Sequence, residues 1–179
     1  MTATPRAAVF LDRDGTLIRD MNYIGDPALV QLVPEAARSV HRLNDAGWPV
    51  IVVTNQSGIA RGFFTMGDYE LVKERIKSEL REAGARIDAT YMCPHHPDYS
   101  GPCECRKPGT LLFRQAAAAL DLDLASSWYV GDKLRDILPA ATLGGHGILA
   151  VKRDRLATER YTLNKATAGN RRFRVAVVF

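Results

Sequence analysis

Short apolar runs alternate with longer amphipathic segments along most of the chain. Five runs have the length and composition of buried strands: 7–11, 49–53, 87–91, 127–130 and 147–151. Four segments carry apolar residues at helical spacing: 34–46, 66–83, 109–120 and 133–143. Strands that alternate with helices favour a parallel sheet covered on both faces. The pattern therefore predicts a Rossmann-like α/β fold.

The chain has 179 residues, which suits one compact domain, expected at 1–151. The remaining segment, 152–179, carries eight Lys or Arg against two acidic residues, so the formal charge of +4 describes this basic tail. The rest of the chain is mildly acidic, which argues against a nucleic-acid partner. The end of the tail, 171–179, has a strand-like pattern, but the polar residues before it predict no clear helix.

The chain contains no run that approaches the roughly 18 apolar residues of a membrane span. Its first six residues have no apolar signal-peptide core, so we expect a cytoplasmic protein without a membrane partner. All three cysteines lie within 93–105, together with two of the four histidines. An odd number of cysteines in one short window argues against disulfides and favours a metal site in a reducing compartment.

Two carboxylates, Asp12 and Asp14, follow the first apolar run and lead into a Gly-Thr turn. Side chains two residues apart on a strand share a face, so both would emerge at the edge where open α/β sheets bind ligands. Paired carboxylates at this edge suit Mg²⁺ binding or nucleophilic and acid/base chemistry. A simple Asp-Gly turn explains an isolated Asp-x-Asp equally well.

The cysteine-rich segment offers two ligand pairs, Cys93-x-His95 and Cys103-x-Cys105. Tetrahedral Zn²⁺ accepts three thiolates and one imidazole, and four protein ligands leave no open position, which predicts a structural zinc loop at 93–105. His96 competes with His95 for the fourth place. A loop of free thiols is the alternative without metal.

Four motifs occur in a fixed order: Asp12 to Thr16, Val53 to Gly58, Cys105 to Pro108, and Val130 to Lys133. Together they resemble the motifs of the haloacid dehalogenase superfamily of phosphatases. Within it, residues 56–62 and 93–97 resemble the branch of the D-glycero-D-manno-heptose 1,7-bisphosphate 7-phosphatases and histidinol-phosphatases. The resemblance covers about residues 7–151 and leaves no room for an inserted cap domain. It implies an open site bordered by loops, and it favours His95 as the zinc ligand.

The resemblance also implies a catalytic set. Asp12 would attack phosphorus to form an aspartyl-phosphate, and Asp14 would serve as the acid and base. Thr54 and Lys107 would hold the phosphoryl group. Mg²⁺ would be bound by Asp12, by the backbone carbonyl of Asp14 and by Asp132.

The implied substrate is a sugar bisphosphate that loses its 7-phosphate, in ADP-heptose and lipopolysaccharide core synthesis, with a monomer as the acting species. Arg106 offers a planar fork for the second phosphate. The expected substrate-binding residues are Arg13, Asp20, Met21, Asn22, Tyr23, Asn55, Gln56, Ser57, Arg106 and Lys133.

Four other functions remain open from the residues. Histidinol phosphate would keep the chemistry but bring a cationic amine, which Arg106 disfavours. A phosphatase of nucleic-acid ends uses similar motifs, but needs a basic groove. A phospho-accepting receiver module also uses Asp, Thr and Lys around Mg²⁺, but has no need of Asp14. A zinc-binding interaction module leaves the carboxylates unexplained.

Overall fold

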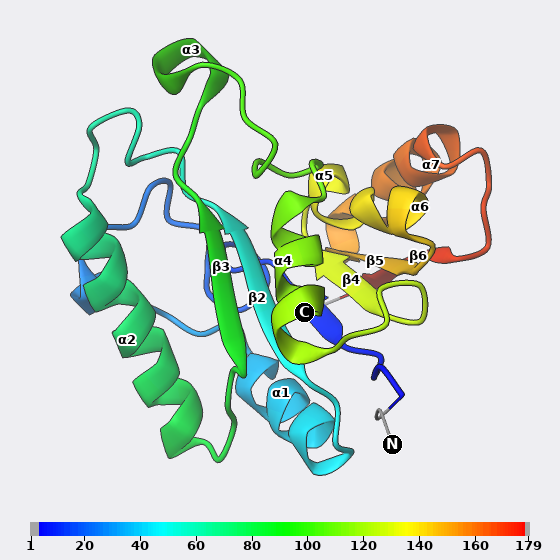
Figure 1. The fold of residues 1–179 in the computed structure, drawn as a ribbon, viewed down its shortest axis with the longest axis horizontal. Helices are drawn as coiled ribbons and strands as arrows, with labels where there is room; N and C mark the ends of the chain where they lie inside the picture. The colour runs from blue at the N-terminus through cyan, green and yellow to red at the C-terminus, as the bar shows by residue number, and fades with distance from the viewer. Residues whose placement is uncertain (1–3, 178–179) are drawn as a thin grey trace.

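The computed structural model describes residues 4–177 and contains one six-stranded sheet (Figure 1). Every pair of neighbouring strands is parallel, and the strand order is β3-β2-β1-β4-β5-β6. The strands are β1 (Val9–Leu11), β2 (Val50–Asn55), β3 (Ala89–Cys93), β4 (Trp128–Gly131), β5 (His146–Val151) and β6 (Phe173–Val177). The first five confirm the predicted strands to within two residues.

The strand register brings the chemically interesting loops together. Leu11 at the end of β1 pairs with Val52 of β2 on one side and with Val130 of β4 on the other. Because the strands are parallel, the residues that follow these positions emerge at the same edge of the sheet. Asp12, Thr54 and Asp132 therefore converge although they are far apart in the sequence.

Helices cover both faces of the sheet, as the apolar pattern predicts. On one face, α1 (Ala36–Asp45) and α2 (Met66–Glu82) bury Val40 and Val72 against β1 and β2. On the other face lie α4 (Leu111–Leu120), α5 (Leu134–Ile137), α6 (Pro139–Leu143) and α7 (Leu156–Ala166). Figure 1 shows α4 in front of the sheet. Its Phe113 packs edge-on against Phe10, which stacks on Tyr129.

The prediction of one helix over 133–143 is wrong. The segment forms two short helices, and Leu138 is both the C-cap of α5 and the N-cap of α6. Pro139 occupies the first position of α6. Proline has no backbone N–H and its ring clashes with the preceding turn, so a helix starts readily at Pro139 but does not run through it.

The basic tail joins the sheet. A 3₁₀ turn (Arg153–Arg155) leads into α7, and β6 pairs with β5 from Gly147 to Val151. Leu163 of α7 and Phe173 of β6 are buried in the same core as α4. The strand-like end of the tail is thus β6, while the helix before it was not predicted. Residues 178 and 179 of the predicted segment lie outside the described residues.

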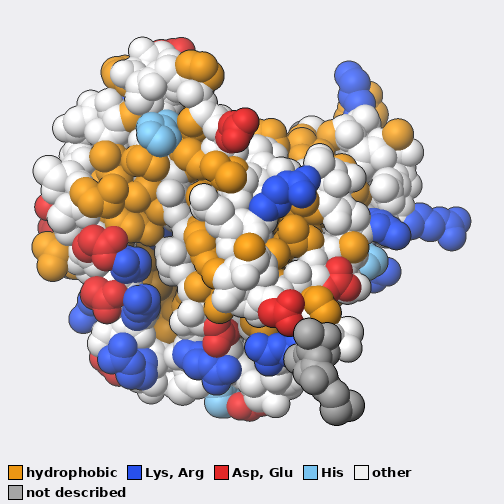
Figure 2. All heavy atoms as spheres, in the orientation of Figure 1, with side chains coloured by type: hydrophobic (Ala, Val, Ile, Leu, Met, Phe, Trp, Pro, Cys, Tyr) orange, Lys and Arg blue, Asp and Glu red, His pale blue; other side chains and the backbone are white. Residues whose placement is uncertain are grey.

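Loops rather than a cap domain surround the carboxyl edge of the sheet throughout 4–177. The loop after β1 contains a 3₁₀ turn (Pro27–Leu29), and the cysteine-rich loop after β3 contains the four-residue helix α3 (Pro97–Ser100). Among the described residues, no helix has the length and hydropathy required to cross a membrane. Figure 2 shows acidic and basic side chains intermixed over α2. On this helix Arg75 forms a salt bridge with Glu79, and Lys77 forms one with Glu74.

Candidate active site and metal centre

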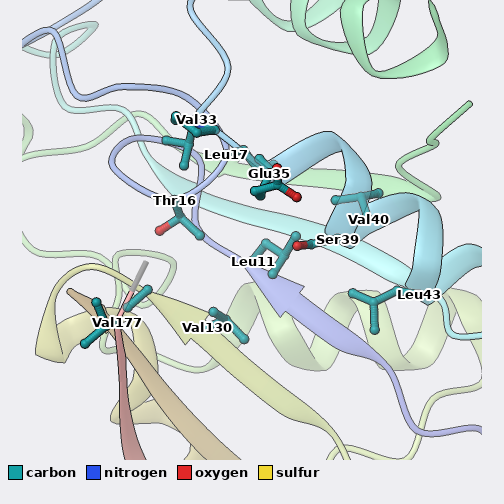
Figure 3. A pocket seen from close by; sticks show the side chains of 13 residues that line it. Leu11, Thr16, Leu17, Val33, Glu35, Ser39, Val40, Leu43, Val130 and Val177 are labelled. Carbon is teal, nitrogen blue, oxygen red and sulfur yellow. The ribbon is translucent and has the colours of Figure 1, made fainter. Parts of the chain in front are cut away.

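Two hollows lie near the carboxyl ends of the central strands. The first, of about 420 Å³, is mainly apolar and lies between α1 and the sheet, bordered by Leu11, Val40 and Val130 (Figure 3). None of the expected catalytic or substrate-binding residues lines it. The second, of about 330 Å³, is polar. It is lined by Arg13, Asp14, Asp20, Asn22, Tyr23, Asn55, Gln56, Ser57, Arg61, His96, Arg106, Lys133 and Arg135. The predicted chemistry therefore belongs to the second hollow, called here the polar pocket.

Lys107 is the electrostatic centre of the site and is only 3% exposed. Its ammonium donates to Asp12 Oδ1 at 2.8 Å and to the Val53 carbonyl at 2.7 Å, and it lies 2.8 Å from Asp136 Oδ1. Burial lowers the pKa of Lys107, but the carboxylates of Asp12 and Asp136 raise it by more than burial lowers it, so the net shift of the pKa is upward. Lys107 is therefore a fixed cation with all three donors engaged.

Asp132 completes a cluster of three carboxylates. One oxygen each from Asp12, Asp132 and Asp136 lie within 4.8 Å of one another. Asp132 Oδ1 is buried without a hydrogen-bond partner, and burial is the main reason that the pKa of Asp132 rises to about 6. A buried, unpartnered carboxylate oxygen beside other carboxylates fits a hard divalent cation such as Mg²⁺. The donor set thus matches the predicted magnesium site at Asp12 and Asp132.

Two glycines allow this close packing of acids. A Cβ on Gly15, whose φ is +80°, would lie 2.4 Å from Asp132 Oδ2. A Cβ on Gly131 would lie 2.3 Å from the Cβ of Asp136. No side chain fits at such distances, so the backbone of both motifs presses directly against the carboxylates.

Asp14, the expected acid and base, is held by two neighbours. Arg13 donates to both of its carboxylate oxygens, at 3.0 and 2.9 Å, and Gln56 Nε2 donates to Asp14 Oδ2 at 2.7 Å. Gln56 Nε2 also donates to Thr54 Oγ1 at 2.8 Å. Gln56 is 4% exposed, and these two hydrogen bonds connect the Thr54 hydroxyl, expected to bind phosphate, to the Asp14 carboxyl. Its amide oxygen accepts from Arg13 at 2.9 Å.

The loop after the first motif supplies one wall of the polar pocket. Lys133 Nζ donates to Asp20 Oδ2 at 2.9 Å, which connects this loop to the start of α5. Asn22 and Tyr23 adopt the left-handed backbone region, with φ of 52° and 65°, and this turn places Tyr23 at the pocket. Met21 is 43% exposed and lies outside the pocket lining, unlike its neighbours.

The four predicted zinc ligands converge. Tetrahedral ligands at about 2.3 Å from Zn²⁺ lie about 3.8 Å from one another. Cys93 Sγ lies 3.6 Å from Cys103 Sγ and 2.8 Å from Cys105 Sγ, and Cys103 lies 3.5 Å from Cys105. His95 Nδ1 lies 3.8 Å from Cys93 Sγ and 3.2 Å from Cys105 Sγ. The cluster has the composition and size of a closed zinc site, with His95 rather than His96 facing it.

The zinc loop is tied to the catalytic residues. Asn55 exchanges two hydrogen bonds with the backbone of Lys107, at 3.0 and 3.2 Å. Arg106 lines the polar pocket and donates to the His95 carbonyl at 3.1 Å. Fixing Cys105 in the cluster therefore fixes the direction in which the chain presents Arg106 and Lys107.

Four further residues belong to this region although they are not among the expected catalytic, substrate-binding or magnesium-binding residues: Arg61, His96, Arg135 and Asp136. Asp136 is 4% exposed, pairs with Lys107 and accepts from the backbone N–H of Lys133 at 3.0 Å. Its position in the first turn of α5 was the available signal. Arg61 lies in a motif quoted for the resemblance, but only the meeting of three loops brings it to the pocket.

Comparisons with known proteins agree with this geometry. A HAD-hydrolase-like family model matches residues 104–167. The chain is 42% identical over 144 residues to D-glycero-beta-D-manno-heptose-1,7-bisphosphate 7-phosphatase of Haemophilus ducreyi, covering 78% of this chain and 79% of that protein. It is 44% identical over 154 residues to D-glycero-D-manno-heptose-1,7-bisphosphate 7-phosphatase of Thermosynechococcus vestitus, covering 81% and 79%.

Solved structures show the same similarity. The D,D-heptose 1,7-bisphosphate phosphatase of B. bronchiseptica, solved with magnesium and phosphate, superposes with a TM-score of 0.81 at 35% identity. The match covers 95% of this chain and 92% of that one. A putative HAD-like phosphatase of Mesorhizobium loti gives a TM-score of 0.79 at 40% identity over 83% of this chain and 74% of that one.

Proposed function

The chain belongs to the D-glycero-D-manno-heptose-1,7-bisphosphate 7-phosphatase family of HAD-like hydrolases, and on that premise we propose that it removes the 7-phosphate of D-glycero-D-manno-heptose 1,7-bisphosphate. The observation that carries the proposal is the convergence of Asp12, Asp14, Thr54, Lys107 and Asp132 beside a cationic pocket. The reaction would serve ADP-heptose and lipopolysaccharide core synthesis.

The reaction proceeds in two displacements. An Asp12 oxygen attacks the phosphorus of the 7-phosphate, the bond from phosphorus to the sugar oxygen breaks, and Asp14 gives its proton to the departing oxygen. Asp14 then takes a proton from water, the water oxygen attacks the aspartyl-phosphate, and inorganic phosphate leaves while Asp12 is regenerated.

Other side chains prepare these steps. Lys107 donates to Asp12 Oδ1 at 2.8 Å and so fixes the position of the nucleophile and places a positive charge beside it. Gln56 and Arg13 fix the position of the Asp14 carboxyl. Mg²⁺, held by Asp12, the Asp14 carbonyl and Asp132, would neutralise the phosphate charge that otherwise repels the nucleophile. Zn²⁺, held by Cys93, His95, Cys103 and Cys105, would have a structural role.

The charge of the polar pocket favours a bisphosphate. Of its five lining cations, Arg13 and Lys133 pair with acids. Within the described chain, Arg61, Arg106 and Arg135 have no carboxylate within 4.0 Å. A second phosphate supplies the missing negative charge, whereas the amine of histidinol phosphate would meet these cations unfavourably.

The proposal includes a cytoplasmic monomer that acts on a small molecule and binds no nucleic acid. Cys93, Cys103 and Cys105 form no disulfide, which leaves all three sulfurs available as metal ligands.

A substrate panel tests the proposed function. Phosphate release is measured with heptose 1,7-bisphosphate, fructose 1,6-bisphosphate and histidinol phosphate, with Asp12→Asn as the inactive control. We expect the highest kcat/KM for the heptose bisphosphate, with release of the 7-phosphate alone. A higher kcat/KM for histidinol phosphate than for the heptose bisphosphate would show that histidinol phosphate is the preferred substrate. Undiminished turnover by Asp12→Asn would refute the covalent mechanism.

A further inference from the structure

Arg61 connects three loops that are far apart in the sequence. Its guanidinium lies 5.8 Å from the ring centre of Tyr23, in the loop after β1, and 4.8 Å from that of Tyr99, in the zinc loop. It contacts His96 Nε2 at 2.7 Å and donates to Tyr99 Oη at 3.4 Å. Phe63, two residues along, packs edge-on against Tyr23. The contacts that Arg61 itself makes with His96, Tyr23 and Tyr99 hold the guanidinium at the rim of the polar pocket.

The anchoring of Arg61 parallels that of Arg106. Arg106 donates to the carbonyl of His95, and Arg61 contacts the ring of His96, the next residue. Both guanidinium groups line the polar pocket. Two cations from different loops are therefore attached to adjacent residues of the zinc loop and face the same space.

The donors of Arg61 are only partly used. A guanidinium has five N–H groups, and the contacts with His96 and Tyr99 engage two of them. Arg61 Nε is buried and has no hydrogen-bond partner within the described residues. A buried N–H without an acceptor is unfavourable, so this placement of the guanidinium carries a cost. A guanidinium whose only task was to join the loops would leave fewer donors unused.

We propose that Arg61 and Arg106 together bind the phosphate that stays on the sugar, so that Arg61 is a second specificity-determining residue. The inference rests on the proposed function, because it requires a substrate with two phosphates. Two guanidinium groups balance the two negative charges of a phosphate monoester, and their forks present several N–H groups to its oxygens. The aromatic rings of Tyr23 and Tyr99, whose centres lie 5.8 and 4.8 Å from the Arg61 guanidinium, help to keep it at the rim.

The test compares arginine variants on two substrates that differ only in the second phosphate. We measure kcat/KM of wild type, Arg61→Ala and Arg106→Ala on heptose 1,7-bisphosphate and on heptose 7-phosphate, which lacks the second phosphate. Each substitution should lower kcat/KM for the bisphosphate about 10- to 100-fold, since the pocket is open and solvent weakens charge interactions there. For heptose 7-phosphate the change should stay below about threefold.

Control variants separate recognition from loop structure. Phe63 packs on Tyr23 but does not line the polar pocket, so Phe63→Ala should leave kcat/KM unchanged for both substrates. Arg61→Lys keeps the charge without the fork, and its loss should be smaller and confined to the bisphosphate. The zinc content of each variant is measured to detect disruption of the zinc loop.

The outcomes distinguish the two proposals. Suppose that Arg61→Ala and Arg61→Lys have normal zinc content and either lower kcat/KM equally for both substrates or leave kcat/KM unchanged for both. The inference about Arg61 is then overturned, while the phosphatase function stands. If wild-type enzyme shows no preference for the bisphosphate over heptose 7-phosphate, the proposed recognition of a second phosphate fails at its premise.

Discussion

Lys107→Met tests whether the buried Lys107 ammonium stabilises the cluster of buried carboxylates. Methionine keeps much of the length of lysine but removes the three contacts that Lys107 makes to Asp12, Asp136 and the Val53 carbonyl. Asp12 and Asp136, whose side chains are 9% and 2% exposed, then lose their common cation. Removing one partner of a buried ion pair costs about 3–5 kcal/mol, because the remaining charge is left uncompensated.

For a chain of this length, each kcal/mol lowers the melting temperature by about 2–4 °C, so the expected decrease is about 6–20 °C. The assay is thermal unfolding followed by circular dichroism, together with urea unfolding at neutral pH. Phosphate release should fall at least about 100-fold, since a fixed charge beside the nucleophile is lost.

A second variant separates charge from packing. In Lys107→Met combined with Asp136→Asn, one of the two uncompensated carboxylates is neutral, so part of the lost stability should return. Activity should stay low because Asp12 still lacks its cation. A free energy of unfolding for Lys107→Met within about 1 kcal/mol of wild type would refute the reasoning, as would a double variant less stable than the single one.

Three further predictions concern the surrounding residues. Gly15→Ala places a Cβ 2.4 Å from Asp132 Oδ2 at a φ of +80°, so Mg²⁺ affinity in calorimetric titration should fall at least about tenfold, and unchanged affinity would contradict the described packing. The pKa of Asp132 is raised to about 6, so the folded metal-free protein holds this proton more tightly than the unfolded chain, and the resulting stabilisation is lost as pH rises toward 6. Mg²⁺ must displace that proton, so its affinity should be about tenfold weaker at pH 5 than at pH 7.5, and equal affinities would exclude Asp132 as a ligand. Gln56→Leu removes the contacts to Asp14 and Thr54, so kcat should fall about 10- to 100-fold with an altered pH profile, whereas a change in KM alone would show that Gln56 only binds substrate.

The parts of the fold that follow from local patterns could be predicted from the sequence. Apolar runs identify β1 to β5, and carboxylates at strand ends place Asp12 and Asp132 at one edge because parallel strands end together. The zinc cluster follows from ligand composition, and the family resemblance selects His95 over His96. The helix α7 was not predicted because Leu163 is its only buried residue and its few apolar residues are spread around the helix rather than confined to one face, so its apolar periodicity is weak.

Features that depend on contacts between loops far apart in the sequence could not be predicted from the sequence. Arg61 and His96 are 35 residues apart, and no local pattern indicates that their side chains touch. The close approach of Gly131 to Asp136 likewise depends on how β4 turns into α5. In the same way, Met21 shares a loop with Asn22 and Tyr23 but lies outside the pocket lining, because the left-handed turn after it redirects the chain.

The attachment of both Arg61 and Arg106 to the His95–His96 segment links the choice of substrate to the oxidation state of three thiols. Oxidants convert metal-bound thiolates to disulfides or sulfenic acids and release the metal. Lys107, which pairs with Asp12 and Asp136 in the hydrolytic centre, follows Cys105 by two residues. Loss of the metal would therefore remove the support of Lys107 together with the common support of the two arginines. Oxidation of the three thiols would weaken hydrolysis and substrate recognition at the same time.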